Sequence, residues 1–144
     1  MLKSLKDILK VTQVLTAQSV TATTASSGVD NANFGSTMFI VDVGAAAAGM
    51  DSASDKFDIV VQHSDVDVSG SYANCADADI FDAEDGANGV AKALDGTADA
   101  SNVHLVHYRG NKRYTRIRIV ETGTVSAPIS VIAVQGHGHL NPAL

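Results

Sequence analysis

Alternating apolar and polar residues over the stretch 103–120 constrain the fold of this chain more than any other feature. In its second half Thr115, Ile117 and Ile119 alternate with charged or aromatic residues, which is the period of a strand with one buried face. Gly110-Asn111 divides the stretch, and both residues tolerate the positive φ angles of a tight turn. The sequence therefore predicts a central β-hairpin with one face in the core and one cationic face.

The outward face of this hairpin is rich in cations. Arg116 and Arg118 lie on the outer side of the return strand, and Arg109 and Lys112 lie in the turn. The chain as a whole is acidic, with a formal net charge of −6, so general affinity for the phosphates of nucleic acid is not expected. We interpret the cationic face as a docking surface for an acidic protein partner, with pairing to the chain's own acidic residues as the alternative.

Several further runs predict short strands, with few helical stretches between them. A short turn of helix is expected over Asn88 to Leu94, and Ile80 and Phe81 are expected to anchor a short strand in the core. The remaining predicted strands lie in residues 11–27, 36–43, 56–63 and 129–135. This pattern favours an all-β fold, an antiparallel β-sandwich of which a jelly roll is one form.

The first residues of the chain form an arm. Apolar residues recur there at helical spacing and predict a short amphipathic helix, which is too short to be stable without a partner surface. These residues are Leu2, Leu5, Ile8 and Leu9. Docking on a partner and packing on the same subunit both fit this arm, whereas membrane binding fits it less well. The expected organisation is an N-terminal arm at 1–12, one β-sandwich domain at 13–136 and a C-terminal tail at 137–144.

Candidate catalytic and metal-binding residues do not combine into a recognisable site. Cys75 is the only cysteine, so a disulfide or a cysteine-based zinc site within the chain is not expected. Asp65–Gly70 copies the first half of a calcium loop, but Ala76 stands where the closing Glu belongs. His137 and His139 supply two ligands where zinc takes about four. We therefore predict neither an enzyme nor a metal or cofactor site.

Six short motifs follow one another in a recognisable order along the chain. They lie at Val11–Val14, Gly28–Asp30, Ser36–Gly44, Gln62–Asp65, Tyr108–Arg116 and Ile129–Gly136. The fifth motif, Tyr-x-Gly-x-Lys-Arg-Tyr-x-Arg, is the most distinctive. Together they resemble a family of tailed-bacteriophage head decoration proteins, also called capsid cement proteins. The chain departs from the family pattern between Asp65 and Ala100, where a longer acidic segment stands in place of a short turn.

The resemblance implies a structural virion protein on the outer surface of a phage capsid. Such a protein is made in the bacterial cytoplasm and binds across major capsid protein subunits, as a homo-oligomer with a trimer as the favoured form. In this role the expected partner-binding residues are the apolar residues of the arm together with Arg109, Lys112, Arg116 and Arg118. Two alternatives remain, namely a head-completion or connector protein, and a calcium- or glycan-binding β module of a phage tail or fibre that uses the acidic residues 65–85.

Overall fold

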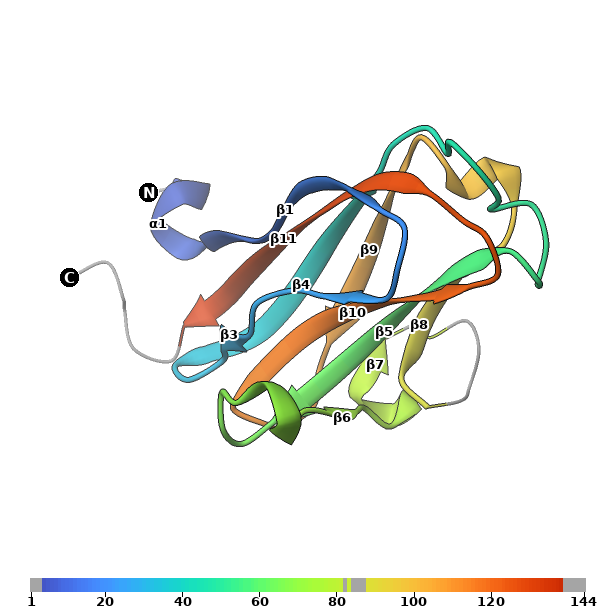
Figure 1. The fold of residues 1–144 in the computed structure, drawn as a ribbon. Coiled ribbons are helices and arrows are strands. Elements are labelled where there is room, and N and C mark those ends of the chain that lie inside the picture. The colour runs from blue at the N-terminus through green and yellow to red at the C-terminus, as the bar shows by residue number, and fades with distance from the viewer. Residues whose placement is uncertain (1–3, 82, 84–87, 139–144) are drawn as a thin grey trace.

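The chain folds into two antiparallel β-sheets that pack face to face, and both described ends of the chain lie at the same end of the sandwich (Figure 1). The computed structural model describes residues 4–81, 83 and 88–138. The predicted all-β sandwich is confirmed, while the jelly-roll form stays a prediction. Over these residues, no helix is both long enough and apolar enough to cross a bilayer.

The first sheet, sheet A, has the strand order β1-β11-β4-β9-β7. A single helical turn, α1 (Leu5–Ile8), precedes it. Its strands are β1 (Lys10–Val20), β4 (Phe34–Val43), β7 (Ile80–Phe81), β9 (Asn102–Tyr108) and β11 (Ala127–Gly138). Strand β1 begins inside the expected arm, and β11 reaches into the expected tail, because both strands continue pairing beyond the apolar runs that predicted them.

The second sheet, sheet B, has the order β2-β10-β5-β6, with β3 also on β10 and β8 also on β5. Its strands are β2 (Thr24–Ala25), β3 (Val29–Asp30), β5 (Lys56–Ser64), β6 (Ala73–Asn74), β8 (Val90–Leu94) and β10 (Tyr114–Thr122). Short 3-10 turns lie between them at η1 (Ser69–Ser71), η2 (Asp77–Asp79) and η3 (Thr97–Asp99).

The core lies between the two sheets and is mainly aliphatic. Phe39 on β4 and Phe57 on β5 are fully buried within it. On β10 the predicted alternation is confirmed, since Thr115, Ile117 and Ile119 are fully buried while the residues between them are half-buried on the outer side. One strand of sheet B therefore presents a core face and a polar face, as its period of two requires.

The predicted hairpin is wrong, because β9 and β10 do not pair with each other. Strand β9 pairs with β4 and β7 in sheet A, whereas β10 pairs with β2, β3 and β5 in sheet B. Residues 109–113 therefore form a corner between the sheets. Its backbone groups bond to other segments, as in the 2.9 Å bond from Arg109 N to Asp79 O and the 2.7 Å bond from Asn31 N to Arg113 O.

Gly110 supports this corner by leaving space rather than by adopting a positive φ. Among the described residues, neither Gly110 nor Asn111 has a positive φ. A Cβ atom at Gly110 would lie 2.6 Å from Cζ of the Tyr108 ring, which folds back over the glycine. The buried Tyr108 hydroxyl accepts the Lys112 N–H at 3.0 Å and lies 3.2 Å from His63 Nδ1 on β5, so this side chain joins the two sheets.

Two further local predictions are wrong. The expected turn of helix at Asn88 to Leu94 is strand β8, because Phe57, Asp58 and Ile59 of β5 offer it an edge to pair with. Phe81, expected in the core, is 52% exposed, while its neighbour Ile80 is buried as predicted. Alternate residues of a strand face opposite sides, so β7 can bury only one of the two.

Candidate functional site

The cations predicted to dock a partner are mostly engaged by the protein itself. Arg109 Nε donates to the carbonyl oxygen of Ala78 at 2.8 Å, and its guanidinium lies 5.8 Å from the centre of the Phe81 ring. Lys112 Nζ forms an ion pair with Asp65 Oδ2 at 2.6 Å. Both members of this pair are partly exposed, so its contribution to the free energy of unfolding is at most about 1 kcal/mol.

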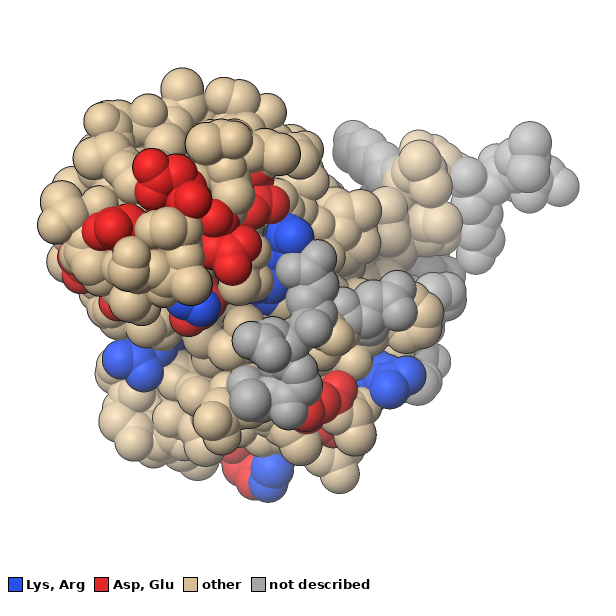
Figure 2. All heavy atoms as spheres, turned by 90° about the vertical axis from the view of Figure 1, so that its right-hand side faces the viewer, with Lys and Arg blue, Asp and Glu red and all other residues tan. Residues whose placement is uncertain are grey.

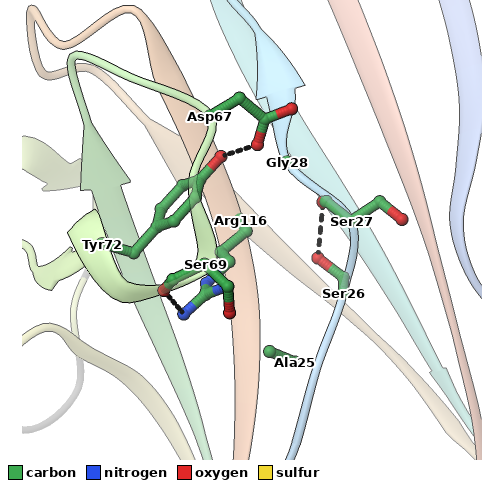
Figure 3. A pocket seen from close by; sticks show the side chains of 8 residues that line it. All are labelled: Ala25, Ser26, Ser27, Gly28, Asp67, Ser69, Tyr72 and Arg116. Carbon is green, nitrogen blue, oxygen red and sulfur yellow. Dashed lines mark hydrogen bonds between the residues drawn. The ribbon is translucent and has the colours of Figure 1, made fainter.

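Arg116 is covered by residues 65–72, which we call the strap (Figure 3). Its Nε donates to Gln62 Oε1 at 2.9 Å and its Nη2 donates to the carbonyl oxygen of Ser69 at 3.3 Å. The guanidinium carbon lies 4.2 Å from the centre of the Tyr72 ring, which places the cation over the aromatic face. The strap thus holds the cationic strand against the chain's own side chains, the alternative that the sequence left open.

Arg118 is the exception among the predicted docking cations. It is half-buried on the outer side of β10, opposite Val60 of β5 and Ala25 of β2. Within residues 4–81, 83 and 88–138, its guanidinium forms no hydrogen bond or ion pair. Arg118 is therefore the one of these four cations that the described part of the chain leaves without a polar partner, whereas Arg109, Lys112 and Arg116 each already have one.

A cleft of about 330 Å³ opens between the strap and the segment 25–28. Figure 3 shows Tyr72, Ser69 and Arg116 on one side and Ala25 with Ser26 on the other. The Tyr72 hydroxyl donates to Asp67 Oδ1 at 2.7 Å, and burial raises the pKa of this tyrosine, so the hydroxyl stays protonated at neutral pH. Sequence reasoning missed the cleft, because its two walls are far apart in the chain and no local pattern links them.

The outer face of sheet A carries a broad exposed apolar surface. Residues directly opposite each other in antiparallel strands project to the same side, so the register arranges apolar residues in rows across this face. One row is Val11, Val134, Met38, His107 and Phe81, the next is Gln13, Ile132, Ile40 and Leu105, and the third is Ser130, Asp42 and Val103. We call these three rows the apolar outer face. Leu105 is 65% exposed and Val11 63%.

The N-terminal arm borders the apolar outer face. Leu5 is 69% exposed and Ile8 43%, whereas Leu9 lies over β11, with Cδ2 3.1 Å from where a Cβ of Gly136 would stand. Leu2 lies outside the described residues. Leu5 and Ile8 therefore extend the exposed apolar surface, while Leu9 packs on β11.

The residues that were candidates for metal binding or catalysis do not come together in the described part of the chain. No group of three or more His, Cys, Asp or Glu side chains in the described ranges could hold a metal ion. The first two carboxylates of the calcium-like segment are bonded within the protein, Asp65 to Lys112 and Asp67 to Tyr72. Burial raises the pKa of Cys75 to about 12, so its thiol is protonated at neutral pH. His139 and residues 82 and 84–87 lie outside the described residues.

Acidic side chains gather instead at the end of the sandwich opposite the termini (Figure 2). The connections at this end carry Asp51, Asp55, Asp95 and Asp99. Asp99 faces Lys92 Nζ at 3.5 Å, and Asp55 Oδ1 accepts the N–H of Thr124 at 2.7 Å. These four aspartates lie outside the apolar outer face, on which Asp42 is the one acidic residue of the three rows.

No protein-family model, curated protein or solved structure matches the chain.

His63 gives the inter-sheet corner a pH dependence. Its Nδ1 lies 3.2 Å from the Tyr108 hydroxyl oxygen and 3.9 Å from Asp79 Oδ2. Burial lowers the pKa of His63 below its ordinary 6.5, an effect larger than the opposing one of the Asp79 carboxylate. As the pH falls below that ordinary value, the unfolded chain binds more protons than the folded chain, and the free energy of unfolding decreases.

Urea unfolding measured between about pH 7 and pH 5 tests this dependence in the wild type and in His63→Gln. One proton contributes a slope of at most about 1.4 kcal/mol per pH unit, and the variant should lose that part of the slope. Equal slopes in the two proteins would show that His63 does not carry the effect.

Proposed function

We propose that this chain is a structural protein of a tailed phage particle. It decorates the outer surface of the capsid, binds across neighbouring major capsid protein subunits and stabilises the assembled shell. It acts as a homo-oligomer, with a trimer as the favoured form. The proposal is supported by the resemblance of six motifs to the pattern of the decoration family, of which Tyr108–Arg116 is the most distinctive.

The observation that carries the proposal is the exposed apolar outer face. Soluble proteins rarely expose broad contiguous apolar surface, and such a surface generally marks an interface. Leu105, Val103 and Phe81 are each more than half exposed on this face, and the arm adds Leu5 and Ile8 beside it. A protein that binds the assembled shell and not the separated subunits stabilises the shell by mass action, without any catalytic group.

In the proposed docking arrangement the apolar residues have a larger part than the cations. The apolar outer face and the arm would provide the main contact, since three of the four expected docking cations are engaged by the protein's own residues. Arg118 lies in sheet B, on the opposite layer of the sandwich, so it would meet a second neighbour or a separate part of the same one. This arrangement suits a protein that bridges adjacent subunits.

Copy number tests the proposal directly. A stained gel of purified particles should show this protein at a copy number approaching that of the major capsid protein, because a decoration protein occupies repeated positions on the shell. A few copies per particle would instead indicate a head-completion or connector protein. Absence from the particle would overturn both.

A further inference from the structure

We propose that the cleft between the strap and segment 25–28 binds a neutral, polyhydroxylated ligand with the chemistry of a sugar ring. This is a binding activity separate from capsid docking. The cleft lies at sheet B, whereas the apolar outer face belongs to sheet A. Its volume of about 330 Å³ falls at the lower end of the roughly 300–1,000 Å³ typical of small-molecule sites. That space suits one ring rather than a large cofactor.

The side chains of the cleft are held in place without a ligand. Gln62 and the carbonyl oxygen of Ser69 fix the Arg116 guanidinium, which in turn stacks on the Tyr72 ring. The Tyr72 hydroxyl is fixed by its bond to Asp67. Because these positions are set beforehand, binding would not have to order them, which favours affinity.

Hydrogen-bonding capacity remains open towards the cleft. Asp67 Oδ2 has no hydrogen-bond partner among the described residues, since the bond from Tyr72 goes to Oδ1. Arg116 Nη1 has only a 3.5 Å contact with Ser69 Oγ, so it can still donate, and the Ser69 hydroxyl can donate as well. A hydroxyl of a sugar both donates and accepts, so neighbouring hydroxyls can bond to a carboxylate and a guanidinium together.

The charges of the cleft select against ions. The cleft is lined by one carboxylate, Asp67, and one guanidinium, Arg116. The carboxylate would repel a phosphate or sulfate ion, and the guanidinium would repel a metal cation. The apolar edge formed by Ala25 and the Tyr72 ring suits the C–H face of a sugar. A neutral polyol satisfies both the polar and the apolar parts of the wall.

Gly28 lets Tyr72 and Asp67 of the strap approach segment 25–28 closely. A Cβ atom at this position would collide with the Tyr72 hydroxyl and stand 2.6 Å from Asp67 Oδ1. Gly28 has no positive φ, so the glycine is required for space rather than for backbone conformation. This close approach is what allows Tyr72 and Asp67 to reach across from the strap to the opposite wall.

The test is an NMR titration of the full ¹⁵N-labelled chain with methyl glucoside, methyl mannoside, methyl galactoside and N-acetylglucosamine. At least one should give saturable shifts on residues 25–28, 67–72 and 116, with affinity in the millimolar range expected of a single ring. Dextran and mannan form a second arm, and saturation by a polymer alone at the same residues would identify a polysaccharide as the source of the ring. Sodium sulfate and calcium chloride form a third.

Matched variants separate binding from folding. Asp67→Asn and Tyr72→Phe should weaken the saturable response at least about tenfold, whereas Asp95→Asn at the acidic end should leave it unchanged. Thermal unfolding of each variant checks that the fold is retained. The residues that shift in the wild-type titration locate the binding site even if a variant fails to fold. The proposal is overturned by no saturable shift with any sugar or polymer, by shifts on another surface, or by sulfate or calcium saturating these residues in preference to the sugars. An unchanged response in folded Asp67→Asn also overturns it.

Discussion

Leu105→Asp should reduce the occupancy of the protein on phage particles at least tenfold while leaving its fold intact. Leu105 ends the middle row of the apolar outer face, on β9, and is 65% exposed, so the free protein can solvate the new carboxylate. In a docked protein the same carboxylate would be buried without a partner, at a cost of several kcal/mol. Occupancy is measured by adding purified protein to particles that lack it, followed by sedimentation and quantitative gel analysis.

Val68→Asp is the matched control for this experiment. Val68 is 60% exposed and lies on the strap, away from the apolar outer face, so the same substitution there should leave occupancy within about twofold of wild type. The variant Arg118→Glu tests separately whether the Arg118 guanidinium on β10 contributes to occupancy. Full occupancy of Leu105→Asp would exclude the apolar outer face as the docking surface, and a loss with Val68→Asp alone would assign docking to the strap.

Tyr108→Ala should lower the free energy of unfolding by about 3–5 kcal/mol, the range for removing a buried aromatic ring. The ring is 3% exposed, fills the space above Gly110 and carries the hydroxyl that accepts the Lys112 N–H. Its loss leaves a cavity at the corner and an unpaired N–H in the same place. Urea unfolding at neutral pH measures the change.

Tyr114→Ala provides the comparison with the same residue type. Tyr114 is half-buried on the outer side of β10, where its ring contacts the Arg113 guanidinium at 5.0 Å. Its removal creates no enclosed cavity and should cost about 1 kcal/mol or less. Equal losses from the two variants would show that Tyr108 has no special part in joining the sheets.

The period of two in the sequence predicts strands well, but not which strands pair. Thr115, Ile117 and Ile119 alternate with polar residues, and this pattern is satisfied equally by a hairpin and by a strand in the opposite sheet, because each buries one face. Gly110 suggests a tight turn, whereas the structure uses its missing side chain to admit the Tyr108 ring. Long-range packing of this kind leaves no local signal.

Of the surfaces that could bind a partner, the sequence predicts the basic one in part and the apolar one not at all. The engagement of Lys112 by Asp65 follows from an acidic segment and a basic strand in one chain, and the sequence offers that alternative. The apolar outer face is not predicted, because Met38 and Ile40 belong to an almost continuous apolar run that is typical of a strand buried on both sides. Only the register of β4 with β9 shows that one side of this run faces outward.

The apolar outer face can form completely only after β11 has taken its place in sheet A. This strand lies between β1 and β4, although a hundred residues or more separate it from the first of these in the chain. Strand β1 and the edge of β4 that faces it can therefore gain their native partner only after β11 has been synthesised. The rows that cross β1, β11 and β4 require β11 to be in place, so a chain whose last strand has not yet joined the sheet lacks the complete apolar outer face.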